Sequence, residues 1–356
     1  MDKLNQYIQE KKAKTKKVRQ LERYLACGTY EFDKELRVLF NTKESNSPIL
    51  DSSFDIYDFD QKWSLPLTKG KLKSWQKPLK VKKEKHKLFQ GNIIWFCSNG
   101  DIKIFSKTET LIICNNKENY LNKIENYTYF SRFFKLPELV YQDDNKYQLI
   151  EKYINFQRQS NQDNPFILKS IYDDYTNYFS TINRESQPAH YTLNDLLKTS
   201  SNAIHVERFK HIVNNIDTQL FEAEFPFIKL HGDLWTANVL LGKEQNGPSR
   251  LWYIDWDESG DYIFFYDFFK FMWNELDVNN RYEYYKCYLS GELDNHFKKA
   301  FDIFQLEFQP ELKKDYFCMF ILNFLLADSR NMPLKVKLNE VSDFQQKVLL
   351  NDSFSS

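Results

Sequence analysis

The segment KLHGDLWTANVLL, residues 229–241, constrains the fold of this chain most strongly. It places His231, Asp233 and Asn238 within eight residues, between apolar runs that favour strands. Core strands rarely carry three such polar groups, because a polar group that is buried without a partner costs several kcal/mol. The segment is therefore predicted to be a short loop that carries functional side chains.

A second segment, RLWYIDWDESGDYIFFYDFF at residues 250–269, has a similar change of character. Its apolar run LWYI ends abruptly in Asp255, and a polar turn with Gly260 follows before Asp267 opens a helical pattern. Taken singly, each of these residues is explained by a turn or a cap. The ordered set is harder to explain in that way.

Phosphoryl transfer from a nucleotide offers one chemistry that needs the whole set. It requires a carboxylate that accepts the proton of the acceptor hydroxyl, and oxygen ligands that hold magnesium on the phosphates. Asp233 is the candidate base, and Asn238 and Asp255 are the candidate metal ligands.

Length, charge and cysteine content exclude several other classes. The chain has 356 residues, enough for two lobes with separate cores, and its formal net charge of zero gives no overall attraction to nucleic acid or membranes. Its cysteines are scattered and form no CxxC pair, which argues against a disulfide framework or a zinc site. The absence of a signal-like start and of a long apolar run predicts a cytoplasmic protein without a membrane span.

The pattern along the chain predicts an α+β fold with two lobes. Residues 88–155 are expected to form a small mixed β-sheet with one helix: a hairpin around Asn99-Gly100, a helix over 116–134, and two strands around the turn at 143–145. Residues 156–356 are predicted to form a larger, mainly helical lobe, interrupted by the strand-like pieces FPFIKL and RLWYIDW.

Residues 1–87 form a basic N-terminal extension whose structure the sequence leaves open. Residues 1–26 have a loose helical pattern, and residues 62–87 hold ten lysines against the single acid Glu84, with Trp63 and Trp75 between them. Binding of an anionic polymer is conceivable there, but a lysine-rich loop is the simpler interpretation. No nucleic acid partner is expected.

The HGDxxxxN segment and the Ile254-Asp255-Trp256 segment, with Gly260 and Asp267 at matching offsets, resemble the aminoglycoside phosphotransferase and choline kinase group. That group has a protein-kinase-like fold. The resemblance implies that Asp233 is the catalytic base and that Asn238 and Asp255 bind Mg²⁺. It also implies that His231 and Asp267 brace the catalytic loop.

The resemblance also implies a nucleotide site in the first lobe. Backbone groups of about Glu151 to Tyr153 would receive the adenine, and Lys103 in DIKIF would hold the phosphates, oriented by Glu125. An alternative alignment makes TLIIC, residues 110–114, the strand that should carry this lysine, and TLIIC has none. Glycines are also few at the expected phosphate loop, with only Gly91 and Gly100 nearby.

The function predicted on these grounds is transfer of phosphate from ATP or GTP to a hydroxyl of a sugar, amino sugar or amino alcohol. The HGDLW spelling tilts the acceptor toward a carbohydrate. The rival hypothesis is a kinase-like binding or scaffold protein with little or no catalysis. Two features leave the acceptor open. The acids at Glu275, Asp277, Glu283, Glu292 and Asp294 suit either an acidic pocket or a solvated helix face, and the rings of 264–273 suit either sugar stacking or a core.

Overall fold

The computed structural model describes residues 3–33, 36–45, 47, 49, 78–82, 88–157, 159–243, 249–327 and 332–350. The chain forms two compact units. Unit 1 comprises residues 1–121 and 137–158, and unit 2 comprises residues 122–136 and 159–356. Apart from residues 78–82, the lysine-rich segment 62–87 lies outside the described residues.

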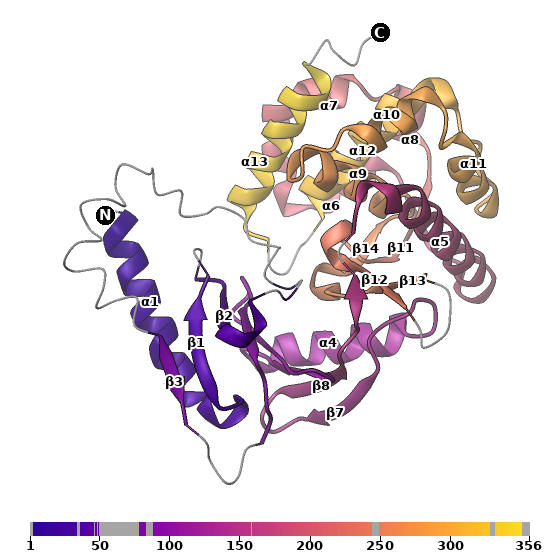
Figure 1. Ribbon diagram of the computed structural model, residues 1–356. Helices are drawn as coiled ribbons and strands as arrows, with labels where there is room; N and C mark the ends of the chain where they lie inside the picture. The colour runs from indigo at the N-terminus through magenta and orange to yellow at the C-terminus, as the bar shows by residue number, and fades with distance from the viewer. Residues whose placement is uncertain are drawn as a thin grey trace. The chain divides into compact units, whose positions relative to one another are not determined.

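Unit 1 is built on a sheet that, within the described part, has eight strands in the order β3-β1-β2-β4-β5-β6-β8-β7 (Figure 1). All its strand pairs are antiparallel. The strands are β1 (Gly28–Phe32), β2 (Val38–Asn41), β3 (Leu79–Val81), β4 (Ile93–Phe96), β5 (Ile102–Phe105), β6 (Glu109–Ile113), β7 (Leu139–Asp143) and β8 (Gln148–Lys152).

Alternation along the strands separates two faces of this sheet. Ile102 and Ile104 of β5 are buried in a core that also holds Val18 of helix α1 (Lys3–Gln20). Because successive side chains of a strand point to opposite faces, Lys103 and Phe105 lie on the other face. There Phe105 packs with Trp95 and other partly buried rings.

The hairpin, the helix and the final strand pair predicted for this region are confirmed. β4 and β5 pair antiparallel around the Asn99-Gly100 turn, helix α4 covers Lys117–Phe130, and β7 pairs with β8. The N-terminal extension, left unassigned by the sequence, contributes α1 and strands β1 to β3. Helix α4 is divided between the units after Leu121.

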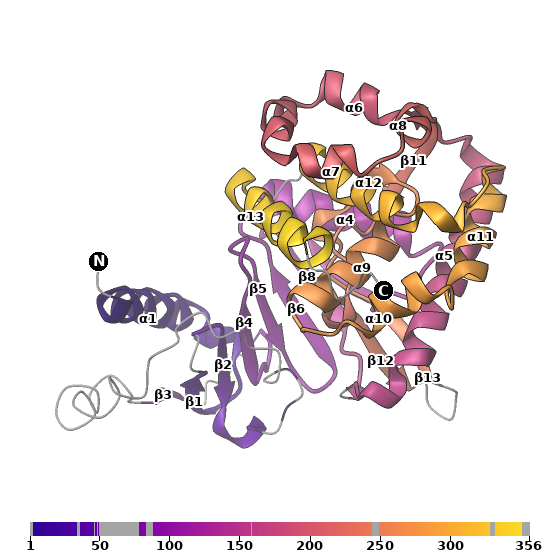
Figure 2. The same cartoon turned by 90° about the horizontal axis from the view of Figure 1, so that it is seen from above.

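Unit 2 is mainly helical, with two small groups of strands (Figures 1 and 2). Its helices are α5 (Asn164–Ser186), α6 (Leu193–Thr199), α7 (Lys210–Asn214), α8 (Thr218–Glu222), α9 (Tyr266–Asp277), α10 (Glu283–Ser290), α11 (Asp294–Ile303), α12 (Lys313–Leu326) and α13 (Leu334–Phe344). Its strands are β10 (Ala189–Tyr191), β11 (Phe225–Leu230), β12 (Val239–Lys243), β13 (Ser249–Tyr253) and β14 (Gly260–Ile263). The α+β class predicted from the sequence is confirmed.

Helices α9 and α12 form the centre of unit 2, and nearly every residue of both is buried. Figure 2 shows α12 among the helices that it contacts, which include α6, α7, α9 and α13. The rings of residues 264–273 belong to this aromatic core, which decides between the two interpretations of that segment. Large buried rings of this kind supply much of the hydrophobic stabilisation of a domain.

The cysteines and the longest apolar helices complete the description of the fold. All five cysteines are free thiols, as their scattered positions predicted. In the part of the chain that the structure describes, no helix combines the length and the apolar character needed to cross a membrane.

Candidate active site

The loop predicted from the opening segment lies between two strands of unit 2. It begins at His231, directly after β11, and ends in a short 3₁₀ turn, Thr236–Asn238, that leads into β12. β12 pairs antiparallel with β13, and Val239 lies opposite Tyr253. The pairing continues one step further, because the Ile254 N–H donates to the Asn238 carbonyl at 3.0 Å. The two sequence motifs therefore meet where Asn238 and Asp255 flank the end of this strand pair.

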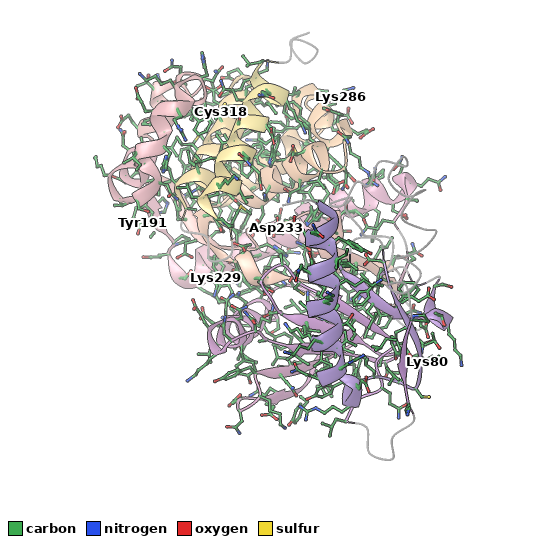
Figure 3. All side chains as sticks on the ribbon, turned by 90° about the vertical axis from the view of Figure 1, so that its left-hand side faces the viewer. Lys80, Tyr191, Lys229, Asp233, Lys286 and Cys318 are labelled. Atoms are coloured by element: carbon green, nitrogen blue, oxygen red, sulfur yellow. The ribbon has the colours of Figure 1, made fainter. Side chains whose placement is uncertain are left out.

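Asp233 is held by two amide side chains. The Nδ2 atom of Asn238 donates to the Asp233 carbonyl at 2.7 Å and lies 3.3 Å from its Oδ2. The Nδ2 atom of Asn274, on α9, donates to the Asp233 Oδ1 at 3.1 Å. The Asp233 side chain keeps a third of its surface exposed, so it remains accessible to solvent. Figure 3 labels Asp233 in this loop and Lys229 on the preceding strand.

A fully buried carboxylate, Asp267 at the start of α9, fixes the first two residues of the loop. Its oxygens accept the N–H of His231 at 2.7 Å, the N–H of Gly232 at 2.9 Å and the hydroxyl of Tyr175 at 2.7 Å. Burial raises the pKa of Asp267, while the nearby His231 and these donors oppose the rise. Asp267 therefore lies where the resemblance expects a brace.

His231 joins the loop to the strand that carries Asp255. Its ring is buried, and its Nε2 lies 2.9 Å from the Ile254 carbonyl. The ring also packs on Trp256, with centroids 4.5 Å apart, and its Nδ1 accepts the Asp233 N–H at 3.3 Å. The bracing position that the resemblance implies for His231 corresponds to these contacts.

Asp255 has a backbone conformation that is rare for residues other than glycine. Its φ of 65° and ψ of 55° are left-handed, which costs about 1–2 kcal/mol and persists only where surrounding contacts impose it. Those contacts come from the second half of α4. Asn126 donates to the Trp256 carbonyl at 2.7 Å, and Lys123 forms an ion pair with Asp257. The Asp255 side chain is exposed, and the left-handed turn that carries it is held by these contacts.

The donor atoms suit a hard divalent cation. The Asn238 nitrogen donates to Asp233, so the Asn238 Oδ1 and the carboxylate of Asp255 are the atoms that would ligate a metal. Among the described residues, no cluster of three or more His, Cys, Asp or Glu could hold a metal by itself. Two protein oxygen ligands, completed by water and phosphate, are what Mg²⁺ usually takes in nucleotide sites.

The predicted nucleotide residues of unit 1 lie on its sheet. β6, the TLIIC strand of the alternative alignment, directly precedes α4, and Lys103 of β5 lies opposite Ile112 of β6. Glu151, on β8, lies opposite Thr110 of β6. The Tyr153 N–H donates to the Thr108 carbonyl at 2.8 Å, so adenine could not also take this group.

Glu125 lies in unit 2, where its Oε1 accepts from the Nζ of Lys229 at 2.7 Å. Its pairing with Lys103 stays a prediction.

Three residues of α9 also contact the loop: Lys270 and Asn274, which the sequence interpretation missed, and Glu275, whose place it left open. Besides Asn274, the fully buried Glu275 accepts the Thr236 N–H at 3.0 Å, and Lys270 lies 3.8 Å from the Asp233 Oδ1. Glu275 is thus neither in an acidic pocket nor on a solvated face. A signal was present in the sequence, since Lys270 and Asn274 interrupt a mainly aromatic run of α9 and, four residues apart, share one face of the helix.

Comparison with known proteins gives similarities in structure only. No protein-family model matches the chain, and no curated protein matches it. A choline/ethanolamine kinase family protein from Mesorhizobium loti is similar, with 13% identity, 72% of this chain and 89% of that chain covered, and a TM-score of 0.36. A choline kinase from Streptococcus pneumoniae is similar with 12% identity, 70% of this chain and 90% of that chain covered, and a TM-score of 0.41. An ADP-bound aminoglycoside phosphotransferase is similar with 14% identity, 69% of this chain and 89% of that chain covered, and a TM-score of 0.39.

The loop geometry predicts a specific effect of Gly232→Ala. Gly232 has a φ of 82°, and a Cβ there would lie 2.1 Å from the Glu258 carbonyl oxygen. Gly100→Ala is a matched control, because φ is 87° but the added Cβ meets only the Asn115 side chain. We expect Gly100→Ala to lower the free energy of unfolding by about 1–2 kcal/mol. Gly232→Ala should cost more and should also reduce turnover at least tenfold, because the loop must move. Urea unfolding and nucleotide consumption measure both; equal effects of the two variants would contradict the prediction.

Proposed function

We propose that the protein is a small-molecule kinase that transfers the terminal phosphoryl group of ATP or GTP to a hydroxyl of a sugar, amino sugar or amino alcohol. One observation carries the proposal. Hydrogen bonds connect the partly exposed carboxylate residue Asp233 to Asn238, whose carbonyl accepts the N–H of Ile254, the residue before Asp255. A turn or a cap explains each residue alone, but not their convergence.

In the proposed reaction the acceptor hydroxyl faces the open side of Asp233. The oxygen of the acceptor hydroxyl forms a bond to the terminal phosphorus, while the bond from that phosphorus to the bridging oxygen breaks and the nucleoside diphosphate leaves. The proton of the hydroxyl passes to the Asp233 carboxylate. Asn238 and Asn274 fix this carboxylate through its two oxygens, so little reorientation is needed at the moment of transfer.

Magnesium is the cofactor that this donor set fits. When bound, it neutralises phosphate charge during transfer. Asn238 and Asp255 are the residues that would hold it, and the strained backbone of Asp255 supports a functional role for this position. The contacts of His231 with Ile254 and Trp256 keep the catalytic loop and the metal strand in one arrangement.

Lys103 remains our candidate for the phosphate lysine. The strand before α4 has no lysine, but Lys103 is the cross-strand neighbour of Ile112 on that strand and shares its face of the sheet. A long side chain from β5 can therefore reach the region that a lysine on β6 would serve. The ring of Phe105, two residues further on, packs edge-on against Tyr153, at a ring-centroid distance of 6.4 Å.

The alternative, a kinase-like binding protein, explains the poor glycine loop but gives no reason for the arrangement around Asp233. The two functions differ in nucleotide consumption. A screen of choline, ethanolamine, aminoglycosides and simple sugars, with ATP or GTP and Mg²⁺, separates them, since a scaffold would consume no nucleotide with any acceptor. Choline, ethanolamine and aminoglycosides are included because the similar proteins are named for them.

Asp233→Asn removes the proposed base with little change of shape. Turnover should fall by a factor of about 10²–10⁴, which is the usual contribution of general base catalysis. Nucleotide affinity, measured by calorimetry, should stay within about twofold, because the change removes no metal ligand. Asp261→Asn, at an exposed position of β14, serves as the control. Turnover of the Asp233 variant within a few-fold of wild type would exclude it as the base.

Asp255→Ala should abolish the effect of Mg²⁺ on nucleotide affinity, because a charged metal ligand is lost. Alanine is also unfavourable in the left-handed conformation, so Asp255→Asn is the matched variant, since asparagine tolerates that region. We expect Asp255→Asn to keep the melting temperature of the wild type and still to weaken the Mg²⁺ effect. Calorimetry with and without Mg²⁺ checks this, and a full Mg²⁺ effect in both variants would remove Asp255 from the metal site.

Lys103→Met deletes the proposed phosphate-binding charge while most of the stem's bulk is kept. Catalytic efficiency should fall well over tenfold with little change in melting temperature. Lys107→Met, at an exposed position two residues beyond β5, is the control and should behave as wild type. If the two variants have similar kinetics, the phosphate contact belongs to another residue.

A further inference from the structure

Lys270 is a lysine in an otherwise apolar stretch of α9, and its side chain is 1% exposed. Its Nζ lies 3.3 Å from the Oε2 of Glu340 on α13 and 3.8 Å from the Oδ1 of Asp233. It also lies 4.9 Å from the centre of the Phe324 ring. An ammonium this deeply buried is tolerated only with charged partners, so these two carboxylates account for its presence.

The position of Lys270 matches one oxygen of Asp233. The Oδ1 atom, near Lys270, also accepts the Asn274 amide at 3.1 Å, whereas Oδ2 has a longer contact of 3.3 Å with Asn238. Both groups on the Oδ1 side come from α9, three and seven residues beyond Asp267, the brace of the loop. One helix therefore determines the position of the loop backbone and the orientation of the Asp233 carboxylate.

We propose that Lys270 is a positioning residue for Asp233, and that Glu340 keeps its ammonium shared between two carboxylates. This inference rests on the proposed function in one respect, the role of Asp233 as the base. Lys270 attracts Oδ1 toward α9, so that Oδ2 faces the acceptor. Glu340 attracts the same ammonium toward α13, so that it does not close onto Asp233 as a tight ion pair.

The distances support shared rather than exclusive pairing. The ammonium is closer to Glu340 than to Asp233, and two negative charges face one positive charge. Burial alone would lower the pKa of Lys270, but attraction to Glu340 and Asp233 outweighs burial and raises its pKa. Trp273 fixes the second carboxylate, since its indole N–H donates to Glu340 Oε2 at 3.4 Å. Lys270 is thus a permanent cation held between two anchored acids.

A purely structural role is the competing explanation, and the chain provides a matched control for it. Lys313 on α12 is 8% exposed, its Nζ lies 2.6 Å from the Asp294 Oδ1, and it lies 5.9 Å from the Tyr288 ring centre. It is a buried lysine with an acid and a ring, like Lys270, but Asp294 and Tyr288 lie outside the loop of residues 231–238. Lys313→Met and Lys270→Met should therefore cost similar stability and differ only in their effect on Asp233.

The test compares Lys270→Met, Glu340→Gln, the double variant and Lys313→Met as full-length proteins. Turnover is measured below all melting temperatures, with Mg²⁺-ATP and the acceptor from the panel that gives the fastest nucleotide consumption, or water if none accelerates it. We expect Lys270→Met to lower kcat about 30- to 100-fold while the KM for ATP stays within about twofold, because a displaced base affects the chemical step. Glu340→Gln should lower kcat several-fold, and the double variant should be no slower than Lys270→Met. Lys313→Met should keep the wild-type kcat.

Amide hydrogen exchange at residues 231–238 tests the positioning without relying on activity. Exchange should rise in Lys270→Met and stay at the wild-type level in Lys313→Met. A kcat of Lys270→Met within threefold of wild type, or an equal loss in Lys313→Met, would overturn the proposal, as would unchanged exchange. If Lys270→Met does not fold, a wild-type kcat in Glu340→Gln overturns it instead. If exchange rises but the wild type consumes no nucleotide, the proposed function fails and the positioning of Asp233 stands.

Discussion

The arrangement of the site depends on one buried carboxylate. Asp267 accepts two backbone N–H groups of the loop and the Tyr175 hydroxyl, and it has no exposed surface. Hydrogen bonds to a charged acceptor contribute about 1.5–3 kcal/mol each, and leaving such donors unpaired inside the protein costs as much. The loop conformation is therefore tied to the folding of the helical core, because Asp267 belongs to α9 and α9 lies within that core. A left-handed glycine at position 232 is one consequence, since both donors must turn toward the same side chain.

The same reasoning explains how the left-handed turn at Asp255 is maintained. Asp255 has a left-handed backbone, which is less favourable than the right-handed one for residues other than glycine, and contacts with neighbouring residues stabilise the turn. Asn126 donates to the Trp256 carbonyl. The Trp256 ring stacks on the Phe130 ring, with centroids 3.8 Å apart, and also contacts the His231 ring. The turn is thus contacted by helix α4 on one side and by the loop of residues 231–238 on the other. These contacts join the two motifs, which are separated in the sequence.

The sequence predicted what depends on local chemistry. The Asn99-Gly100 hairpin, helix α4 and the β7–β8 pair follow from turn residues and periodicity, and the structure confirms them. The polar loop was placed correctly, because three polar residues between apolar runs have few alternatives. Partners distant in sequence could not be predicted. Lys270 and Glu340 are 70 residues apart, and no local pattern links α9 to α13. The unassigned first residues posed the same difficulty, since β1 and β2 join the sheet by pairing with each other, with β3 and with β4.

The helix α9 shows why the missed residues belong together. Its apolar positions pack in the core, so a polar residue there is unfavourable unless it is paired. Asp267, Lys270, Asn274 and Glu275 are all paired, and each has a partner in the loop from His231 to Thr236. A core helix that needed only to pack would use leucine or phenylalanine at these positions, as the rest of α9 does. Burying these four polar side chains has a desolvation cost, and their hydrogen bonds and ion pairs maintain the conformation of one loop. This cost is explained if the loop must hold a carboxylate in one orientation, which a scaffold protein would not require.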